Sequence, residues 1–318
     1  MTLHDFRYPA AILALIICYF FGDTYFISLL VIIALHSMAA IGLSLLSGYA
    51  GQISLGHAAF YGIGAYTSAL IALHIGITPW ITIPMSAVIA GIVAWAVGPI
   101  MFRLKGHHLA MATLAFGIIV HVALVEMRGI TGGPNGMGGI PPLSFFGTPL
   151  LFDEDIFPLV WGVVIVMILL SENLIRSPHG FTLRAVGARE HVVPTLGSDT
   201  NKSKCLVLII SAVFAAIAGA IYGHYIGYLS PGPFSTTFSV KLLVMVAIGG
   251  FSRIWGVVLG VIFVTFLSEW LKPFGNVELL FYGALLIFTM IYCPNGLLSQ
   301  LGVVASNAAR NLRQRTPS

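Results

Sequence analysis

The stretch CLVLIISAVFAAIAGAIYG, residues 205–223, runs for 19 residues without a charged side chain. An α-helix needs about 20 predominantly apolar residues to cross the hydrocarbon core of a bilayer. Similar runs recur along the chain, in which 58% of the 318 residues are hydrophobic and only 8% are charged. Soluble domains typically have about 25% charged residues. The sequence therefore predicts an all-α, polytopic integral membrane protein.

The apolar runs predict a single transmembrane domain over residues 1–318, with about ten helices in a range of about 9–11. Their approximate positions are 9–22, 25–47, 58–75, 80–102, 109–126, 156–172, 205–229, 238–250, 254–272 and 278–293. The run 238–250 is too short to cross the bilayer as a simple helix, so we expect it to be broken or merged with its neighbour. The first run has no small-x-small cleavage site, which predicts an uncleaved span and not a signal peptide.

The orientation follows from lysine and arginine, because cytoplasmic loops carry an excess of both. With the N-terminus inside, 12 of the 15 basic residues fall on the cytoplasmic side: Arg7, Arg103, Lys105, Arg176, Arg184, Arg189, Lys202, Lys204, Arg253, Arg310, Arg313 and Arg315. The acidic cluster 153–155 falls outside. We expect both termini to be cytoplasmic (N-in and C-in), with a basic cytoplasmic tail at 306–318. The net charge of +4 then requires no nucleic-acid partner.

The largest cytoplasmic loop is expected at 173–204, and its second half, AREHVVPTLGSDTNKSK, is the part of the chain that most resembles a soluble protein. A short amphipathic helix is predicted near 181–196. Its apolar face would carry Val186, Val193 and Leu196, and its polar face Arg189 and Glu190. Periodicity leaves two alternatives open. The helix either rests on lipid headgroups or docks into another protein.

The motif GYAGQISLGHAAFYGIGAY (48–66) combines many glycines with polar side chains. Glycine lets helices approach closely, and it lets a helix break where protein or water satisfies the backbone. Plain helix packing and an unwound or re-entrant segment on a substrate pathway both fit, and the polar side chains favour the pathway. The candidate pathway residues are Gly48, Gly51, Gln52, Ser54, Gly56 and His57.

A second motif, ITGGPNGMGGIPP (130–142), is dense in turn-forming residues and lacks the pattern of a phosphate-binding loop. We expect a structured turn on the outer face, which either contacts a partner or only connects two spans. Its candidate residues are Gly132, Gly133, Asn135 and Gly136. The stretch MVAIGGFSRIWGVVLG (245–260) repeats the glycine-rich theme and hints at two related halves.

Ionisable residues inside spans are functional hypotheses by default, because a charge at the membrane centre costs about 2.5–3.5 kcal/mol. The residues that qualify are His36, His121, Lys241 and Glu269. Structural roles are favoured for all of them: Lys241 and Glu269 would lie near the outer interface, and the histidines would be neutral packing residues. The cysteines, at 18, 205 and 293, lack metal-ligand spacing. No pattern of an enzyme is present, so we predict no catalytic residue and no metal site.

Several motifs in order resemble one family, the LivM-type permeases of branched-chain amino-acid ABC transporters. They are GYAGQISLGHAAFYGIGAY, RLKGHHLAMATLAFG (103–117), ITGGPNGMGGI and MVAIGGFSRIWGVVLG, and the resemblance extends from about residue 35 to the closing YCPNGLLSQL (292–301). It implies a non-catalytic permease subunit in the bacterial cytoplasmic (inner) membrane. It also implies that the loop 173–204 contains a coupling helix that fits a groove on an ATPase subunit.

The coupling residues that the resemblance implies are Ala188, Arg189, Glu190 and Gly197. The family's Glu-Ala-Ala core appears here as Arg-Glu-His, so this chain departs from the pattern at the contact itself. The implied partners are a homologous second permease, two ATP-binding-cassette ATPases, a periplasmic substrate-binding protein that delivers leucine, isoleucine or valine, and membrane lipid. ATP and Mg²⁺ would bind to the ATPases, so no cofactor is expected in this chain.

Two alternatives remain. The same architecture could import urea, short amides or other amino acids, since nothing in the candidate pathway decides the cargo. An ion-coupled secondary transporter would instead work without an ATPase, and the central spans lack the buried acidic residue that such a transporter needs.

Overall fold

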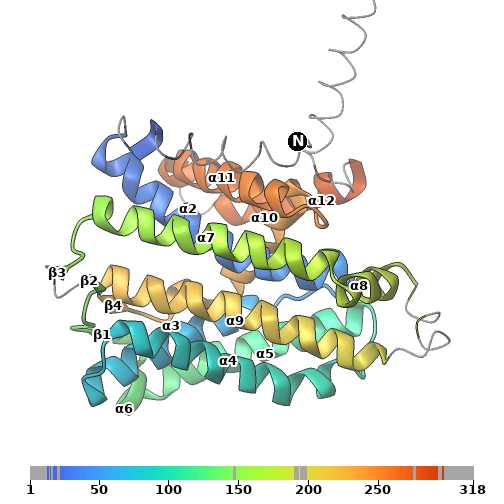
Figure 1. The fold of residues 1–318 in the computed structure, drawn as a ribbon, viewed down its shortest axis with the longest axis horizontal. Helices are drawn as coiled ribbons and strands as arrows, with labels where there is room; N and C mark the ends of the chain where they lie inside the picture. The colour runs from blue at the N-terminus through green and yellow to red at the C-terminus, as the bar shows by residue number, and fades with distance from the viewer. Residues whose placement is uncertain are drawn as a thin grey trace, which may run out of the picture.

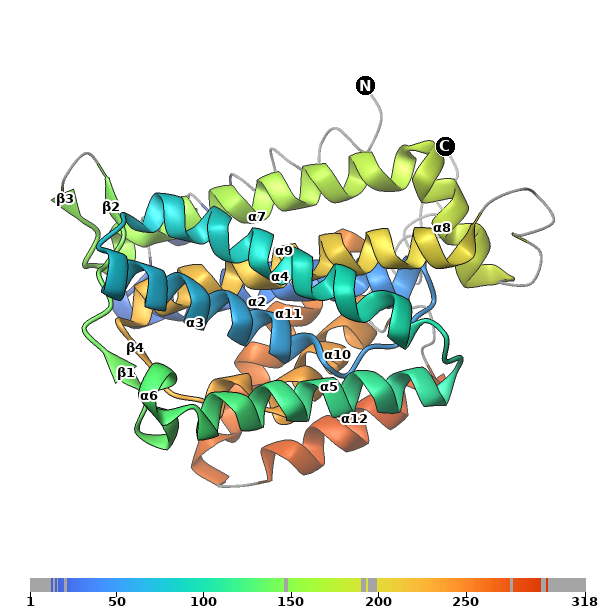
Figure 2. The same cartoon turned by 90° about the horizontal axis from the view of Figure 1, so that it is seen from below.

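The computed structural model describes residues 22–145, 148–189, 199–274 and 277–292, together with positions 13, 15, 17–19, 193 and 296. The described chain is mostly helical, and its long helices lie side by side along one axis (Figure 1, Figure 2). Seven of them are long and apolar enough to cross a membrane. They are α2 (Thr24–Ser44) with the π-helix η1 (Leu45–Tyr49), α3 (His57–Ile75), α4 (Pro79–Met101), α5 (His107–Glu126), α7 (Asp153–Arg176), α9 (Thr200–Ile226) and α11 (Ile254–Leu271).

Shorter elements complete the described chain. The helices are α6 (Arg128–Thr131), α8 (Pro178–Ala188), α10 (Thr236–Gly249) and α12 (Glu278–Tyr292), with single turns η2 (Gly133–Asn135), η4 (Gly232–Phe234) and η5 (Lys272–Phe274). Two antiparallel pairs of two-residue strands lie at one end of the bundle: β1 (Met137–Gly138) with β4 (Tyr228–Leu229), and β2 (Ser144–Phe145) with β3 (Thr148–Pro149).

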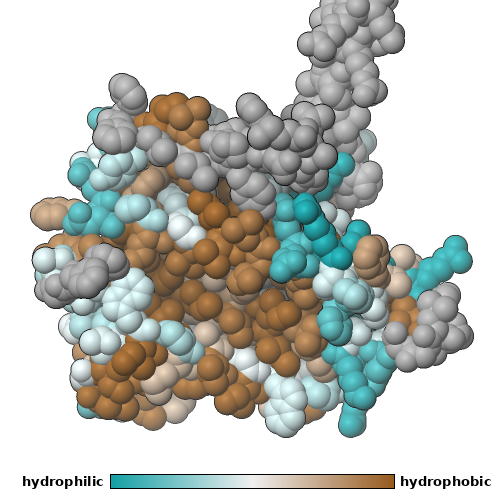
Figure 3. All heavy atoms as spheres, in the orientation of Figure 1, coloured by the Kyte–Doolittle hydropathy of each residue, from teal (hydrophilic) through white to brown (hydrophobic). Residues whose placement is uncertain are grey.

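The predicted polytopic membrane fold is confirmed in its main features. Each predicted run from 25–47 to 278–293 coincides with a described helix. The run 9–22 and the tail 306–318 fall mostly or wholly outside the described residues, so the count of about ten helices and the orientation of the termini stay predictions. Figure 3 shows an apolar belt across the middle of the molecule, with hydrophilic side chains gathered at the α8 end.

Helix α2 forms the centre of the core and is almost entirely buried from Val31 onward. Helices α3 and α9 approach each other closely because small residues line their contact. A Cβ atom on Gly64 would overlap the backbone of Ala216, and one on Gly219 would overlap the carbonyl oxygen of Tyr61. No larger residue fits at these two positions.

Buried hydroxyl and imidazole groups join the same helices. His224 Nε2 in α9 lies 2.8 Å from Ser68 Oγ in α3, and its Nδ1 lies 2.8 Å from the carbonyl oxygen of Pro141. Inside an apolar bundle, such bonds satisfy polar groups that have no access to water and fix the helices relative to one another.

Helix α8 differs from the helix predicted at 181–196. It starts earlier, because the Ser177 hydroxyl accepts a hydrogen bond from the amide of Gly180 and Pro178 occupies the first helical position. It also ends earlier, since Arg189 leaves the helical region with φ −152° and ψ 85°. Val186 and the isolated position Val193 are both buried, at 2% exposed, as expected for an apolar face. Leu196 lies outside the described residues.

The short helix α10 is neither broken nor merged with α11, contrary to the expectation for 238–250. It is one continuous helix of 14 residues that ends at Gly249, and the following Gly250, with a φ of 98°, stops it. A helix of this length rises only about 21 Å. Phe234, just before α10, packs against Tyr61 and Tyr66 in α3, so α10 begins at mid-depth in the bundle.

Candidate functional site

The junction between α2 and α3, residues 45–56, is the first part of the candidate site. The α-helix ends at Ser44, continues as the π-helix η1 and then loses helical structure over 50–56, with Gly51 in the left-handed region at φ +67°. π-Helical turns occur frequently at functional sites. The unwound segment that the glycine-rich motif predicted is therefore present, and its role in a substrate pathway stays a prediction.

Protein groups satisfy the backbone of this unwound segment. The amide of Leu55 donates to Thr113 Oγ1 in α5 at 3.0 Å, and the amide of Ala58 donates to Ser239 Oγ in α10 at 2.9 Å. The Ser252 hydroxyl donates to the carbonyl of Gly48 at 3.0 Å. An irregular backbone inside a membrane requires such partners. The break is thus tied to α5, to α10 and to the turn before α11.

The glycines of the break are required for close backbone contacts. A Cβ atom on Gly48 would overlap the carbonyl of Phe251, and one on Gly56 would overlap the carbonyl of Thr113. A Cβ atom on Gly51 would lie 3.0 Å from the Cα atom of Gly187 in α8. Backbone therefore lies against backbone where the break meets α8.

The polar side chains of the motif point into the protein. Gln52 Nε2 donates to the carbonyl of Ala50 at 3.0 Å. His57 is fully buried, with Nε2 3.0 Å from Ser211 Oγ, and Ser211 in turn donates to the carbonyl of Gly42. Ser54 is 2% exposed. None of these three side chains lines the cavity described below.

Two of the four predicted coupling residues lie at the end of α8. Ala188 is its last residue and Arg189 follows it, while Glu190 and Gly197 lie outside the described residues. A Cβ atom on Gly187 would lie 2.6 Å from the carbonyl oxygen of Tyr49. The end of α8 is therefore in direct contact with the break.

The predicted outer loop is a structured turn at the opposite end of the bundle from α8 (Figure 1). Gly132, Gly133 and Gly136 all adopt positive φ, between 61° and 76°. The Tyr228 hydroxyl donates to the carbonyl of Asn135, and β1 pairs with β4. The loop thus joins the end of α9, and its exposure to the cell exterior stays a prediction.

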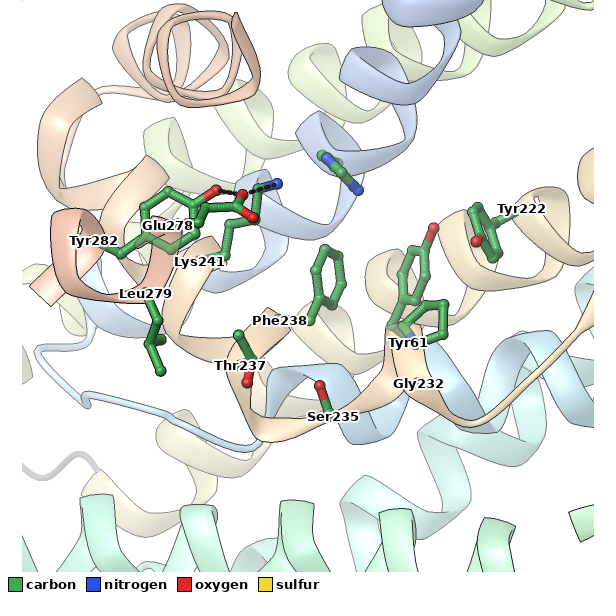
Figure 4. Close-up of a pocket in the computed structure, with 12 residues that line it drawn as sticks. Tyr61, Tyr222, Gly232, Ser235, Thr237, Phe238, Lys241, Glu278, Leu279 and Tyr282 are labelled. Atoms are coloured by element: carbon green, nitrogen blue, oxygen red, sulfur yellow. Dashed lines mark hydrogen bonds and ion pairs between the residues drawn. The ribbon is translucent and has the colours of Figure 1, made fainter. Parts of the chain in front are cut away.

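A cavity of about 510 Å³ opens between α2, α3, α9, α10 and α12 (Figure 4). Lys241 on α10 and Glu278 on α12 form an ion pair in its wall, with Nζ and Oε1 3.5 Å apart. The Tyr282 hydroxyl donates to the same carboxylate. Tyr61 and Tyr222 line the other end, and Phe238 lies between them and the ion pair. The cavity therefore combines a charged pair with an aromatic wall.

Sequence patterns single out two residues of this cavity, Lys241 and His36, and do not reveal the cavity itself. Both qualify as ionisable residues in spans, and the sequence favours structural roles for both. Lys241 lines the same cavity as His36 of α2, and its position near the outer interface stays a prediction. Glu278 was not singled out. The signal that could have identified Glu278 is its position as a carboxylate at the start of a short apolar span.

The other ionisable candidates do not line the cavity. Glu269 pairs with Lys272 at 2.7 Å and accepts a hydrogen bond from Tyr25, which fits the structural role favoured for it. His121 Nδ1 is buried and has no hydrogen-bond partner among the described residues. Within the same residues, no group of three histidine, cysteine or acidic side chains could hold a metal ion.

Comparison with known proteins gives consistent matches. A family model described as "Branched-chain amino acid transport system / permease component" matches residues 25–290. The high-affinity branched-chain amino acid transport system permease protein LivM of Escherichia coli (strain K12) is 31% identical over 287 residues, which cover 83% of this chain and 68% of that protein. The corresponding LivH of the same strain is 24% identical over 284 residues, covering 83% of this chain and 91% of LivH.

A more distant relative has a different named cargo. The tyrosine transport system permease protein of Clostridioides difficile (strain R20291) is 27% identical over 172 residues, which cover 52% of this chain and 54% of that protein. No solved structure matches the chain.

Proposed function

The chain belongs to the branched-chain amino acid transport system permease component family, and from this membership we propose that it is the membrane subunit of an ATP-binding-cassette importer for leucine, isoleucine and valine. The observation that carries the proposal is the family match over residues 25–290, which contain all seven long apolar helices. The importer would work in the bacterial inner membrane, with both termini in the cytoplasm.

The proposed complex contains a second, homologous permease. The chain is similar both to LivM and to LivH, which are permease proteins of one kind of transport system in the same organism. Two related permeases that pair with each other would explain this double similarity. Two ATPases on the cytoplasmic face and a periplasmic binding protein complete the proposal, and ATP and Mg²⁺ would bind to the ATPases alone.

The contact between α8 and the break supports a route for the coupling. Closure of the ATPases would displace α8, and α8 is in contact with residues 49–51 through Gly187. The break has irregular backbone, so it deforms more easily than the helices that it joins. Its far end is hydrogen-bonded to Thr113 and Ser239, and Ser239 lies on α10 beside the cavity-lining Phe238. A push on α8 would thus reach the cavity wall through contiguous contacts.

The first experiment measures uptake. The chain is expressed together with candidate ATPase, permease and binding-protein subunits from its own organism, in cells without their own branched-chain amino-acid transport. We expect uptake of radiolabelled leucine that isoleucine and valine inhibit and that is lost when either ATPase is omitted. Uptake of urea or short amides in place of leucine would contradict the cargo assignment.

The second experiment tests the class of transporter. The purified chain alone, in proteoliposomes, is expected to show no concentrative uptake of leucine under a proton or sodium gradient. Concentrative uptake driven by such a gradient would show that the chain is an ion-coupled secondary transporter and not a subunit of an ATP-dependent importer.

A second cargo has one observation in its favour. The relative from Clostridioides difficile is named for tyrosine transport, and the cavity of this chain is lined by Tyr61, Tyr222, Phe238 and Tyr282. Aromatic side chains pack well against an aromatic amino acid. Radiolabelled tyrosine, compared with leucine in the same cells, separates the two cargoes.

A further inference from the structure

The cavity has two chemically different ends. Lys241 and Glu278 lie at one end, Tyr61 and Tyr222 lie at the other, and Phe238 lies between them (Figure 4). An α-amino acid is divided in the same way, since its ammonium and carboxylate groups share one carbon and its side chain extends away from them. The cavity volume of about 510 Å³ falls within the range of small-molecule sites.

The ion pair faces the cavity and retains unused hydrogen-bonding capacity. The side chains of Lys241 and Glu278 remain 18% and 39% exposed. An ammonium group has three donors and a carboxylate about four acceptor positions. The Tyr282 hydroxyl donates to Glu278, and Lys241 Nζ lies 5.6 Å from the centroid of the Tyr282 ring. These contacts orient both charges and leave each able to bind a further group.

Two residues that line the cavity, Tyr61 and His36, each contain a buried polar atom without a described partner. The hydroxyl of Tyr61 and Nδ1 of His36 are buried and have no hydrogen-bond partner in the described part of the chain. Tyr61 is 1% exposed and packs against Tyr222 and Phe238. A buried polar group without a partner is costly. Surrounding protein covers both atoms, so a ligand reaches them only when the neighbouring side chains move.

We propose that this cavity is a binding site for a zwitterionic amino acid, in which Lys241 binds the carboxylate and Glu278 binds the ammonium group. The inference rests on the proposed function and adds the site at which the membrane subunit itself recognises its cargo. The aliphatic side chain of the amino acid packs against Phe238 and Tyr61, on the side of the cavity away from the ion pair.

The charge arrangement explains why the site prefers a zwitterion. The two charges of an amino acid can align antiparallel to Lys241 and Glu278, so that every charge has an opposite neighbour and the total stays zero. A ligand with a single charge gives the site a net charge, because the ion pair itself is neutral. Such an uncompensated charge is costly away from water. An uncharged amide gains only ordinary hydrogen bonds. The site therefore rejects urea and short amides.

The experiment measures ligand protection of a cysteine in the cavity. Thr237 lines the cavity and is exposed, so Thr237→Cys is introduced into a chain that carries Cys18→Ser, Cys205→Ala and Cys293→Ser. The rate of modification by a small neutral maleimide is measured in membranes that contain the whole complex without its binding protein. The ligands are leucine, leucinamide, which lacks the carboxylate, and 4-methylpentanoate, which lacks the ammonium group.

We expect leucine to slow the modification and the two analogues to have no effect at the same concentration. Lys241→Met and Glu278→Gln should each raise the leucine concentration needed for protection about tenfold or more, as for loss of a charged hydrogen-bonding partner. The matched control is Glu269→Gln with Lys272→Met. This pair has its charges 2.7 Å apart and does not line the cavity. Its opposite charges also act on Lys241, but the double substitution removes both together, so protection should be unchanged.

Equal protection by leucinamide or 4-methylpentanoate would overturn the inference, and so would protection that survives both Lys241→Met and Glu278→Gln. The comparison of ligands needs no change in the ion pair, so it holds even if those variants fail to fold. Leucine uptake by the wild-type complex without any protection of Thr237→Cys would refute the site alone. A complex that takes up no amino acid would refute the proposed function.

Discussion

Single glycines decide how closely the helices of this bundle approach one another. Gly64 and Gly219 lie where α3 and α9 touch, and Gly249 and Gly260 lie where α10 and α11 touch. At each of these positions a Cβ atom would overlap backbone of the facing helix. Backbone cannot move aside as a flexible side chain can, so these glycines fix the spacing of the bundle.

Gly219→Ala is expected to destabilise the protein by about 1–3 kcal/mol, the usual cost of overpacking a tightly packed core. The new methyl group would overlap the carbonyl of Tyr61. Thermal unfolding of the purified chain in detergent measures the effect. Gly162→Ala in α7 is the control, because no atom lies within 4 Å of the added Cβ there. Equal stability of the two variants would contradict the packing argument.

Asp199 offers a second prediction at the residue scale. Its carboxylate accepts hydrogen bonds from the amides of Lys202 and Asn201 at the start of α9. The bond from the Lys202 amide is the main reason that the pKa of Asp199 lies below its ordinary value. The Asp199 cap therefore stabilises the folded protein fully above the pKa that Asp199 has in the unfolded chain. This stabilisation disappears as the pH falls through the lower pKa that Asp199 has in the folded protein.

Asp199→Ala should accordingly increase proteolysis near residues 200–203 at neutral pH. The difference from wild type should shrink as the pH falls below the folded-state pKa, which limited digestion by an acid-tolerant protease can follow. A difference that persists unchanged at low pH would show that the carboxylate charge is irrelevant to the cap.

The elements were predictable to different extents. The long helices follow from uninterrupted apolar runs, and the break after Ser44 follows from glycines beside polar residues. The start of α8 was missed because Ser177 and Pro178, which start it, precede the amphipathic pattern. The cavity was also missed, since its residues come from five helices whose arrangement no local pattern contains. Only tertiary packing brings Lys241 to Glu278.

The contact between α8 and the break yields a prediction for this pair of elements. Gly187→Ala would press a methyl group against the carbonyl of Tyr49 and change how movement of α8 reaches the break. We expect leucine uptake to fall about tenfold, a size typical of coupling effects, while more ATP is hydrolysed per leucine transported. Gly129→Ala, with open space around it, is the matched control. If Gly187→Ala hydrolyses the same amount of ATP per leucine as the wild type, this contact is not part of the coupling route from α8 to the cavity.

On the scale of the whole molecule, the two ends of the bundle differ in character. The α8 end carries Arg176, Arg184 and Lys202, and the opposite end carries the acidic residues of 153–155 at the start of α7. An apolar belt separates the ends (Figure 3). This arrangement supports the predicted orientation, with α8 in the cytoplasm, because basic residues favour that side.

Cysteine labelling of intact cells tests the orientation. Leu151→Cys and Lys202→Cys are introduced separately at exposed positions of the two ends. A membrane-impermeant maleimide applied from outside should label Leu151→Cys, and should label Lys202→Cys only after the cells are opened. Labelling of Lys202→Cys on intact cells would place α8 on the wrong side for an ATPase.

The late start of α10 has an electrostatic consequence. The aligned peptide dipoles of a helix place roughly half a positive charge at its first turn. In α10 this turn borders the cavity, and Thr237 within it is exposed. Lys241 carries a full positive charge one to two turns later, and Glu278 balances that charge at 3.5 Å. The partial charge of the first turn therefore remains uncompensated beside a neutral ion pair, and it should orient an approaching zwitterion with its carboxylate toward the start of α10.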